Sequence, residues 1–214
     1  MTIAWHGYSC VSIEGKGKEV ASILFDPFAP DGKAIRRVTD ALVVLSSSLP
    51  EKAREDFLDK HPKAGLIDSP GEYDRGGAYF NAFTALSNPL RSIVSVTVDG
   101  MVVVFAGGLT KQPEDAFLER FDTVDVLLLP VGAGDGLAPK AAAAFARALE
   151  PHCVVPIRYK TARTVGSYEP LTVWLKEMGQ GTSATSGEPR ARFVKDEVRQ
   201  AELRLVVLND GQDE

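Results

Sequence analysis

The sequence predicts an α/β protein built most simply from two packed β-sheets flanked by helices. The first half reads as short strands separated by turn residues, and the second half alternates strands with helices. The chain has 214 residues, which suits one domain, residues 1–214, around one core. Strand–helix alternation would equally allow an open doubly wound sheet, and composition does not separate the two architectures.

Short strands are expected at the start of the chain. Glycine-containing turn signals at residues 7–9 and 15–18 separate the first three of them, and the alternation of apolar and polar residues in 11–14 suits a half-buried strand. The unbroken apolar run Ala41–Leu45 is typical of a strand buried on both faces. The expected strands are Thr2–His6, Cys10–Glu14, Val20–Phe25 and Ala41–Leu45.

A helix is expected at Glu51–His61, because a proline and an acidic residue lie near its start and basic residues lie near its end. The middle of the chain is β again. The pair Asp99-Gly100 between Val-rich runs predicts a tight hairpin, since such a turn needs positive φ angles. The expected strands here are Ala78–Ala85, Ser92–Asp99 and Met101–Ala106.

The second half changes to helical periodicity between buried strands. Residues 179–196, which begin with a run rich in Gly, Ser and Thr, are expected to form a flexible loop. The expected helices are Pro113–Phe121, Pro139–Glu150 and Tyr168–Met178, and the expected strands are Val124–Pro130, Cys153–Ile157 and Leu203–Leu208.

Composition excludes several function classes. The net charge of −5 gives no global basic surface for nucleic acid or anionic lipid. No apolar run approaches the roughly 20 residues that span a membrane, and the N-terminus does not resemble a signal peptide. The two cysteines, Cys10 and Cys153, lie in apolar strands and are expected to be reduced. The sequence thus predicts a soluble, cytoplasmic protein.

Six short motifs occur in order along the first three-quarters of the chain. They are Trp5–Cys10 (WHGYSC), Asp26–Phe28 (DPF), Pro70–Tyr73 (PGEY), Phe105–Leu109 (FAGGL), Leu129–Gly132 (LPVG) and Val155–Thr161 (VPIRYKT). In these motifs the chain resembles the metallo-β-lactamase superfamily, and within it the small ascorbate-phosphate-lactonase-like branch of predicted metal-dependent hydrolases. The resemblance covers residues 2–161 and implies a four-layer αββα sandwich with the active site at one edge of the two sheets.

The resemblance also implies where the family's metal ligands would lie, and the residues at those positions differ. The family signature His-x-His-x-Asp-His follows an apolar strand, which here is Ala41–Leu45. The corresponding residues are Ser47, Leu49, Glu51 and Lys52 for the signature, Leu86 for a later histidine, Gly108 for the bridging aspartate and Arg158 for the last histidine.

Histidines are scarce in this chain. It has three, His6, His61 and His152, and the resemblance places none of them at a ligand position. Zinc and manganese sites of hydrolases are built from imidazoles and carboxylates, and the lone carboxylates Asp26 and Glu51 would hold at most a weak hard cation. The sequence therefore predicts a degenerate site with no metal cofactor, although the family would use zinc or manganese.

Two hypotheses for the pocket rest on Lys52 and Arg158, the two cationic side chains at positions where the family has histidines. In the first, Lys52 and Arg158 neutralise Glu51 and Asp26, because buried carboxylates are costly unless they are paired, and the unused site becomes a salt-bridged plug. In the second, the two cations hold a phosphate or carboxylate group of a small ligand, to which Tyr159 adds ring stacking.

A third hypothesis is catalysis without a metal. In this hypothesis Ser47 is the nucleophile of a serine–lysine type of hydrolase, and Lys52 or Glu72 is the base. In the ligand-binding hypothesis, by contrast, Ser47 would only donate a hydrogen bond to the ligand. Glu72 has the simpler role of bonding to neighbouring groups beside the pocket.

Taken together, these residues predict a metallo-β-lactamase-fold, hydrolase-like protein that has lost its metal ligands. Such a pseudoenzyme would bind an anionic small molecule or a protein partner. The alternative is an active hydrolase of esters, lactones or phosphoesters that works with an atypical metal or none. The sequence does not indicate the oligomeric state.

Overall fold

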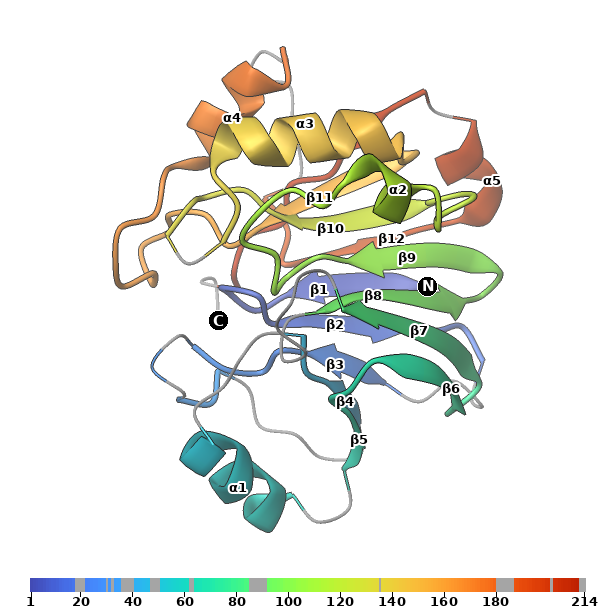
Figure 1. Ribbon diagram of the computed structural model, residues 1–214, viewed down its shortest axis with the longest axis vertical. Helices are drawn as coiled ribbons and strands as arrows, with labels where there is room; N and C mark the ends of the chain where they lie inside the picture. The colour runs from blue at the N-terminus through green and yellow to red at the C-terminus, as the bar shows by residue number, and fades with distance from the viewer. Residues whose placement is uncertain are drawn as a thin grey trace.

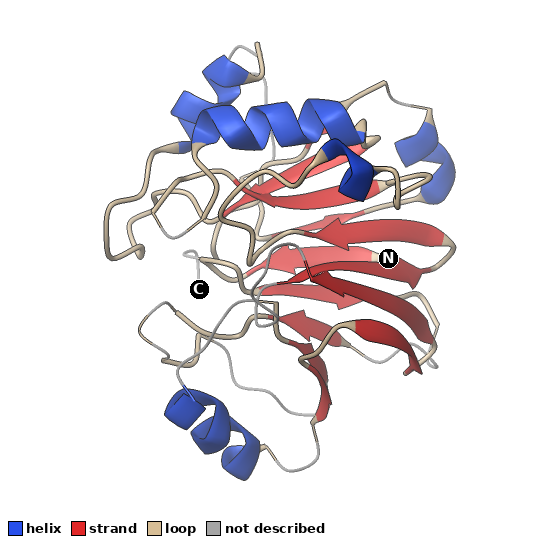
Figure 2. Cartoon of the chain, in the orientation of Figure 1, coloured by secondary structure: helices blue, strands red, loops and turns tan. Residues whose placement is uncertain are grey.

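The computed structural model places most of the chain. It describes residues 1–17, 22–29, 31, 33–35, 41–46, 51–61, 64–84, 92–134, 136–179, 187–200 and 202–211, with the backbone alone for Glu51 and Ser92. Within these residues, two mixed β-sheets lie between helices (Figures 1 and 2).

The first sheet contains the N-terminal strands. β12, β1, β2 and β3 pair antiparallel in this order, and β3, β4 and β5 then pair in parallel. The strands are β12 (Arg190–Arg192), β1 (Thr2–Trp5), β2 (Val11–Glu14), β3 (Ile23–Phe25), β4 (Leu42–Val44) and β5 (Gly65–Ile67).

The second sheet takes strands from the middle and the end of the chain, in the order β13-β11-β10-β9-β8-β7-β6. β9, β10, β11 and β13 run parallel, and β6, β7, β8 and β9 are joined antiparallel. The strands are β6 (Gly71–Arg75), β7 (Ala78–Thr84), β8 (Ser92–Val98), β9 (Met101–Phe105), β10 (Val126–Pro130), β11 (Cys153–Ile157) and β13 (Arg204–Leu205).

The hairpin predicted at Asp99-Gly100 is confirmed. Val98 pairs with Met101, and both turn residues have positive φ, 52° for Asp99 and 71° for Gly100. This geometry matches the right-handed twist of the two strands that it joins.

Helices lie on the outer sides of the two sheets, so the predicted αββα sandwich is confirmed and a single doubly wound sheet is excluded. In Figure 1, α1 lies on the side of the first sheet, and α3 and α4 lie beyond the second. The helices are α1 (Glu51–Lys60), α2 (Asp115–Leu118), α3 (Pro139–Leu149), α4 (Leu171–Glu177) and α5 (Lys195–Arg199).

Aromatic packing joins the layers. The rings of Phe25 in β3 and Phe105 in β9 lie 4.4 Å apart between the two sheets. On the outer face of the first sheet, Phe57 of α1 packs in a second cluster with Phe28, whose ring centroid is 5.0 Å away. Offset and edge-on contacts of this kind add to the stabilisation from apolar burial.

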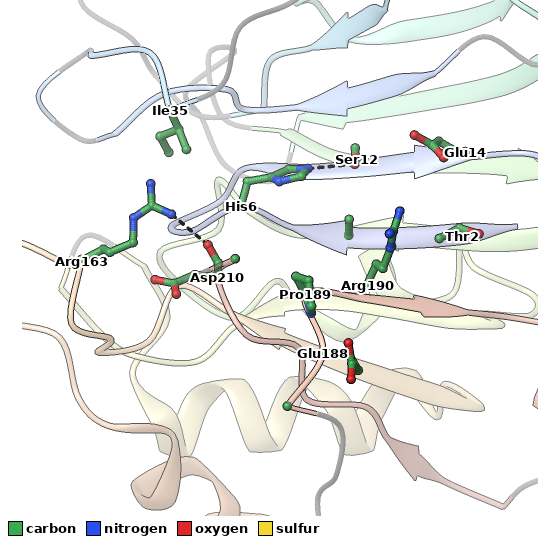
Figure 3. A pocket seen from close by; sticks show the side chains of 13 residues that line it. Thr2, His6, Ser12, Glu14, Ile35, Arg163, Glu188, Pro189, Arg190 and Asp210 are labelled. Carbon is green, nitrogen blue, oxygen red and sulfur yellow. Dashed lines mark hydrogen bonds between the residues drawn. The ribbon is translucent and has the colours of Figure 1, made fainter. Parts of the chain in front are cut away.

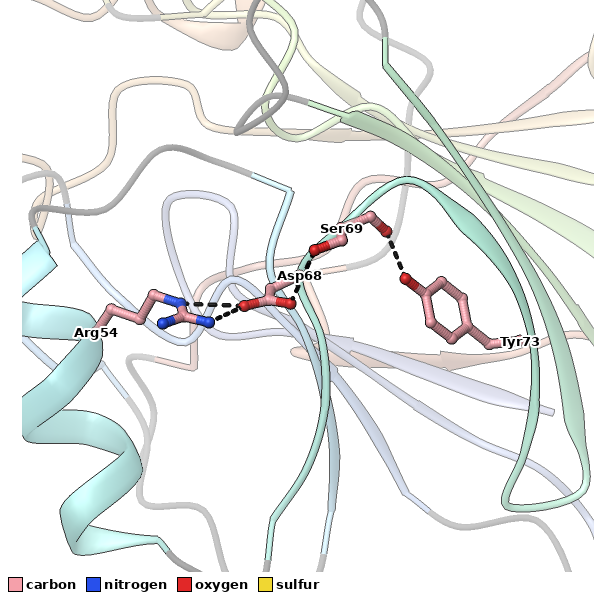
Figure 4. Close-up of polar contacts among 4 residues, drawn as sticks. All are labelled: Arg54, Asp68, Ser69 and Tyr73. Carbon is pink, nitrogen blue, oxygen red and sulfur yellow. Dashed lines mark hydrogen bonds and ion pairs between the residues drawn. The ribbon is translucent and has the colours of Figure 1, made fainter.

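A polar network fixes α1 to the segment that follows β5 (Figure 4). The guanidinium of Arg54 donates two hydrogen bonds to Asp68, one of them at 3.0 Å from Nε. Ser69 donates to the other oxygen of Asp68 at 3.3 Å, and its own carbonyl accepts from the Tyr73 hydroxyl at 2.8 Å. The network links α1 to β6, and thus the first sheet to the second.

Three predicted elements, α2, α4 and β13, are shorter than expected, and four elements were not expected. β5 and β6 were not predicted, because one is three residues long and the other is the polar edge sequence GEYDR, whose strand conformation comes from pairing with β7. β12 lies in the stretch 179–196 that was expected to be a loop, and α5 begins at the end of that stretch. β12 forms because β1 offers it a free edge, as in the pair Ile3–Ala191, and residues 180–186 lie outside the described part of the chain.

Candidate functional site

The ends of parallel strands from both sheets meet at one edge of the sandwich. β3 and β4 end just before Asp26 and Ser46, and β9 and β11 end just before Gly107 and Arg158. β9 and β10 point to the left in Figure 1, toward the loops that form this edge. Ligand sites of sheet proteins are commonly built at the carboxyl ends of parallel strands.

Asp26 joins the ends of β3 and β4. It is buried, and its Oδ1 accepts a hydrogen bond from the Ser46 backbone N–H at 2.7 Å. The Ser46 hydroxyl donates to Oδ2 at 2.8 Å. A buried carboxylate that accepts two short hydrogen bonds is well satisfied as an anion. The sequence singled out Asp26 but not the role of Ser46, whose only signal was its place directly after an apolar strand.

Arg158 connects the ends of β11 and β9 in the second sheet, beside the first loop of the chain. Its side chain is 6% exposed, and Nη1 donates to the carbonyl oxygen of Gly107 at 2.8 Å. The same carbonyl accepts from the hydroxyl of Ser9 at 3.3 Å. Ser9 and Gly107 were not predicted as site residues. The guanidinium is thus an internal tie at the site edge.

Gly108 lies directly against the first sheet. A Cβ atom at this position would be 2.2 Å from the carbonyl oxygen of Ser46, which is closer than atoms approach without a backbone shift. The position that the resemblance gives to the bridging aspartate is therefore closed to a side chain on this backbone. Gly132, after β10, similarly packs against Arg158, whose carbonyl oxygen would lie 2.4 Å from a Cβ.

Strained backbone conformations gather at this edge. Among the described residues, six other than glycine have positive φ; Asp99 is in a hairpin and Glu150 caps a helix. The other four lie in the loops of this edge: Tyr8, Asp26, Ala133 and Arg158, with φ of 47°, 38°, 58° and 56°. Strain of this kind clusters at functional sites, because the surrounding structure must hold it in place.

Tyr159 follows Arg158 but belongs to the core. Its ring lies 4.7 Å from that of Trp5, and its hydroxyl donates to the carbonyl of Leu208 at 2.9 Å. Burial raises the pKa of this hydroxyl, and the charge of Asp210 raises it further. The side chain is buried rather than presented for stacking on a ligand.

The remaining predicted residues are dispersed. Lys52 is exposed on α1 and lines a shallow pocket with Asp31 and Asp56. Glu72 lies on the edge strand β6, where its hydrogen bond raises the pKa of Tyr79. Ser47 and Leu49 lie outside the described residues, as does the side chain of Glu51. Asp26 and Arg158 are the two predicted residues that the described structure places at the site edge.

The three histidines lie apart from one another. His6 Nε2 is 2.9 Å from the hydroxyl of Ser12. His61 follows α1, with its ring 4.7 Å from Phe57. The backbone N–H of His152 bonds to the carbonyl of Val124 at 3.0 Å, beside the start of β11.

Comparison with known proteins agrees with this architecture. A family described as a β-lactamase superfamily domain matches residues 2–158. The chain belongs to this superfamily. The superfamily fold is also seen in solved structures: a candidate Zn-dependent hydrolase from Thermotoga maritima has a TM-score of 0.75 and 24% identity, covering 97% of this chain and 99% of that one. Igni18, a metallo hydrolase from Ignicoccus hospitalis, has a TM-score of 0.61 and 17% identity, covering 96% and 94%.

A relative in sequence is the UPF0173 metal-dependent hydrolase of Lysinibacillus sphaericus. It is 27% identical, and the match covers 75% of this chain and 86% of that protein. These names correct one expectation. The prediction of no metal cofactor is contradicted, because the relatives of this superfamily protein are named as metal-dependent and Zn-dependent hydrolases.

A zinc or manganese centre needs several imidazole, thiolate or carboxylate ligands close together. Across the described ranges, no three His, Cys, Asp or Glu side chains gather where they could hold a metal ion. Arg158 has no lone pair to offer, and Gly108 has neither a ligand atom nor room for one. These two positions do not fit a metal ligand set, and no chemical step through a metal follows from them.

Within the part of the chain that the structure describes, no helix is both long and apolar enough to cross a membrane. The cytoplasmic location stays a prediction.

Proposed function

We propose that this superfamily protein binds a small anionic molecule without hydrolysing it. The observation that carries the proposal is the buried guanidinium of Arg158, tied to the Gly107 carbonyl at the position that the resemblance gives to a histidine ligand. Metal-dependent hydrolysis needs a metal that activates water or polarises the substrate, and a guanidinium stays protonated and cannot bind one. A metal of the kind that the relatives' names imply would need ligands other than Arg158 and Gly108.

The proposed anionic ligand is supported by the loop that follows β11. Residues 158–163 have the sequence RYKTAR, so three cations lie within six residues at the site edge. A guanidinium binds carboxylate and phosphate groups through paired, charge-assisted hydrogen bonds. Arg163 is exposed, and its Nη1 donates to the carbonyl of Asp210 at 2.9 Å, which holds the side chain in one orientation.

The competing function is hydrolysis, which the names of the relatives favour. The two functions are separated by assays on the purified protein with phosphodiester, lactone and phosphate ester substrates, each with zinc or manganese added. We expect no turnover above background. Turnover that a chelator abolishes would overturn the proposal and establish a metal-dependent hydrolase. Turnover that survives the chelator and is lost in Ser47→Ala would establish catalysis without a metal.

A further inference from the structure

A groove runs along the outer face of β1 and β2, and nothing in the superfamily comparison assigns it a role (Figure 3). Its cavity volume is about 610 Å³, within the range of pockets that hold small molecules. Its floor includes Thr2 and Ala4 of β1 and Ser12 of β2, and its walls are formed by residues 187–190 and 210–211.

The groove exists because this part of the first sheet has no helix over it in the described structure. α1 packs through Phe57 on the outer face of β3–β5. Further along the sheet, Ile3 and Trp5 point into the core, which leaves Thr2 and Ala4 on the opposite face of β1. Their small side chains leave space that larger ones would fill.

Polar groups converge at the end of the groove nearest the site edge. His6 Nε2 and the hydroxyl of Ser12 lie 2.9 Å apart, and Arg163 reaches the same cavity from the loop after β11. Figure 3 shows Arg163 and Asp210 at this end, with His6 pointing along the groove.

Hydrogen bonds fix the position of Arg163 at the end of the groove. Its guanidinium donates to the Asp210 carbonyl at 2.9 Å, and its backbone N–H donates to the hydroxyl of Thr161 at 3.2 Å. Thr161 in turn donates to the Asp210 carboxylate at 2.7 Å. Because these hydrogen bonds already fix the loop and the guanidinium, ligand binding costs less conformational entropy.

The charges differ along the groove. Arg190, Glu14 and Glu188 line the half away from Arg163, so positive and negative groups are mixed there. Thr2 and His6 are four residues apart in an extended chain, which separates the two ends by about 13 Å. The groove therefore suits a small molecule with an anionic group at the Arg163 end and polar groups along its length.

We infer that this groove binds a small organic anion, with a carboxylate or phosphate group held by Arg163 beside His6 and Ser12. The inference rests on the proposed function, since it gives the anionic ligand its place. It differs from the second hypothesis of the sequence analysis, in which Lys52 and Arg158 bind the anion, because Lys52 is exposed on α1 and Arg158 is buried.

The test is isothermal titration of the full chain with inorganic phosphate and with citrate. We expect millimolar or tighter binding of at least one probe, and a loss of about tenfold or more in affinity in Arg163→Gln, because a charge-assisted hydrogen bond is removed. The matched control is Arg75→Gln, an exposed arginine at the end of β6, which should bind the probe as the unaltered protein does.

Two results would overturn the inference: no binding of either probe in the millimolar range, or equal affinity in Arg163→Gln and Arg75→Gln. Both are read from binding alone. Substrate turnover would overturn the proposed function and leave these affinities unchanged, so the two failures are distinguishable.

Discussion

The guanidinium Nη1 of Arg158 lies 2.8 Å from the carbonyl oxygen of Gly107 and ties the end of β11 to the end of β9. We expect Arg158→Met to lower the free energy of unfolding by about 2 kcal/mol, because a buried hydrogen bond from a charged donor is lost. Urea denaturation measures the change. Arg75→Met, on the exposed edge strand, is the control and should stay within about 0.5 kcal/mol of the unaltered protein. Equal stability of the two variants would show that the tie is not important for folding.

Gly108 should not tolerate even one added carbon. A Cβ at this position would meet the Ser46 carbonyl oxygen at 2.2 Å, so Gly108→Ala requires the two sheets to shift apart locally. We expect a loss of about 2 kcal/mol or more in stability. Gly187→Ala is the matched control, since no atom lies within 4 Å of its added Cβ. Thermal unfolding of both variants measures the difference. Equal stability of Gly108→Ala and Gly187→Ala would contradict the close contact between Gly108 and Ser46.

Replacement of Asp26 should depend strongly on the new side chain. Asp26→Ala leaves the buried Ser46 N–H without its acceptor and should cost about 2 kcal/mol. Asp26→Asn keeps an acceptor oxygen and tolerates the positive φ of 38° better, so we expect a smaller loss. A double-mutant cycle with Ser46→Ala measures the coupling through the Ser46 hydroxyl, and additive effects would argue against that hydrogen bond.

Stability should fall in acid partly through Asp125. Burial raises the pKa of this carboxyl, but hydrogen bonds from Arg199 and the Val102 backbone N–H outweigh it and hold the pKa below its usual value. A depressed folded-state pKa contributes stability that is present above about pH 4 and is lost as the pH falls through the folded-state value.

Arg199→Gln tests this contribution. It should lower the free energy of unfolding at neutral pH and flatten its decline below about pH 4, since the pKa of Asp125 then moves back toward its unfolded value. Urea unfolding across this pH range measures both effects. If the free energy of unfolding of Arg199→Gln declined in acid as it does in the unaltered protein, Asp125 would not contribute to the acid sensitivity.

Cys153 should be unreactive in the folded protein. Burial raises the pKa of its thiol to about 12, so almost none is the nucleophilic thiolate at neutral pH. Iodoacetamide followed by mass spectrometry should modify Cys153 only after denaturation. Rapid labelling of the native protein would show that β11 opens locally.

Much of the fold could be predicted from the sequence, because it depends on local signals. Apolar strands, prolines at helix starts and the Asp99-Gly100 turn act through neighbouring residues, and the structure has the corresponding elements at the expected places, although α2, α4 and β13 are shorter than expected. The strands β5, β6 and β12 could not be predicted in this way, and β6 is a polar sequence whose conformation comes from pairing with β7. β5 and β12 are short, and their conformation depends on partners that lie far away in the sequence, as when Arg192 pairs with Thr2.

The candidate site, like the fold, could be predicted only in part from the sequence. The sequence alone determined which residue types occupy the family positions: three histidines in the whole chain, glycine at 108 and arginine at 158. Only the tertiary structure decided what they contact. The closure of Gly108 against Ser46, the hydrogen bond from Arg158 to Gly107 and the groove beside Arg163 arise where strand ends from separate parts of the chain meet. Such contacts depend on distances in space, which spacing along the chain does not encode.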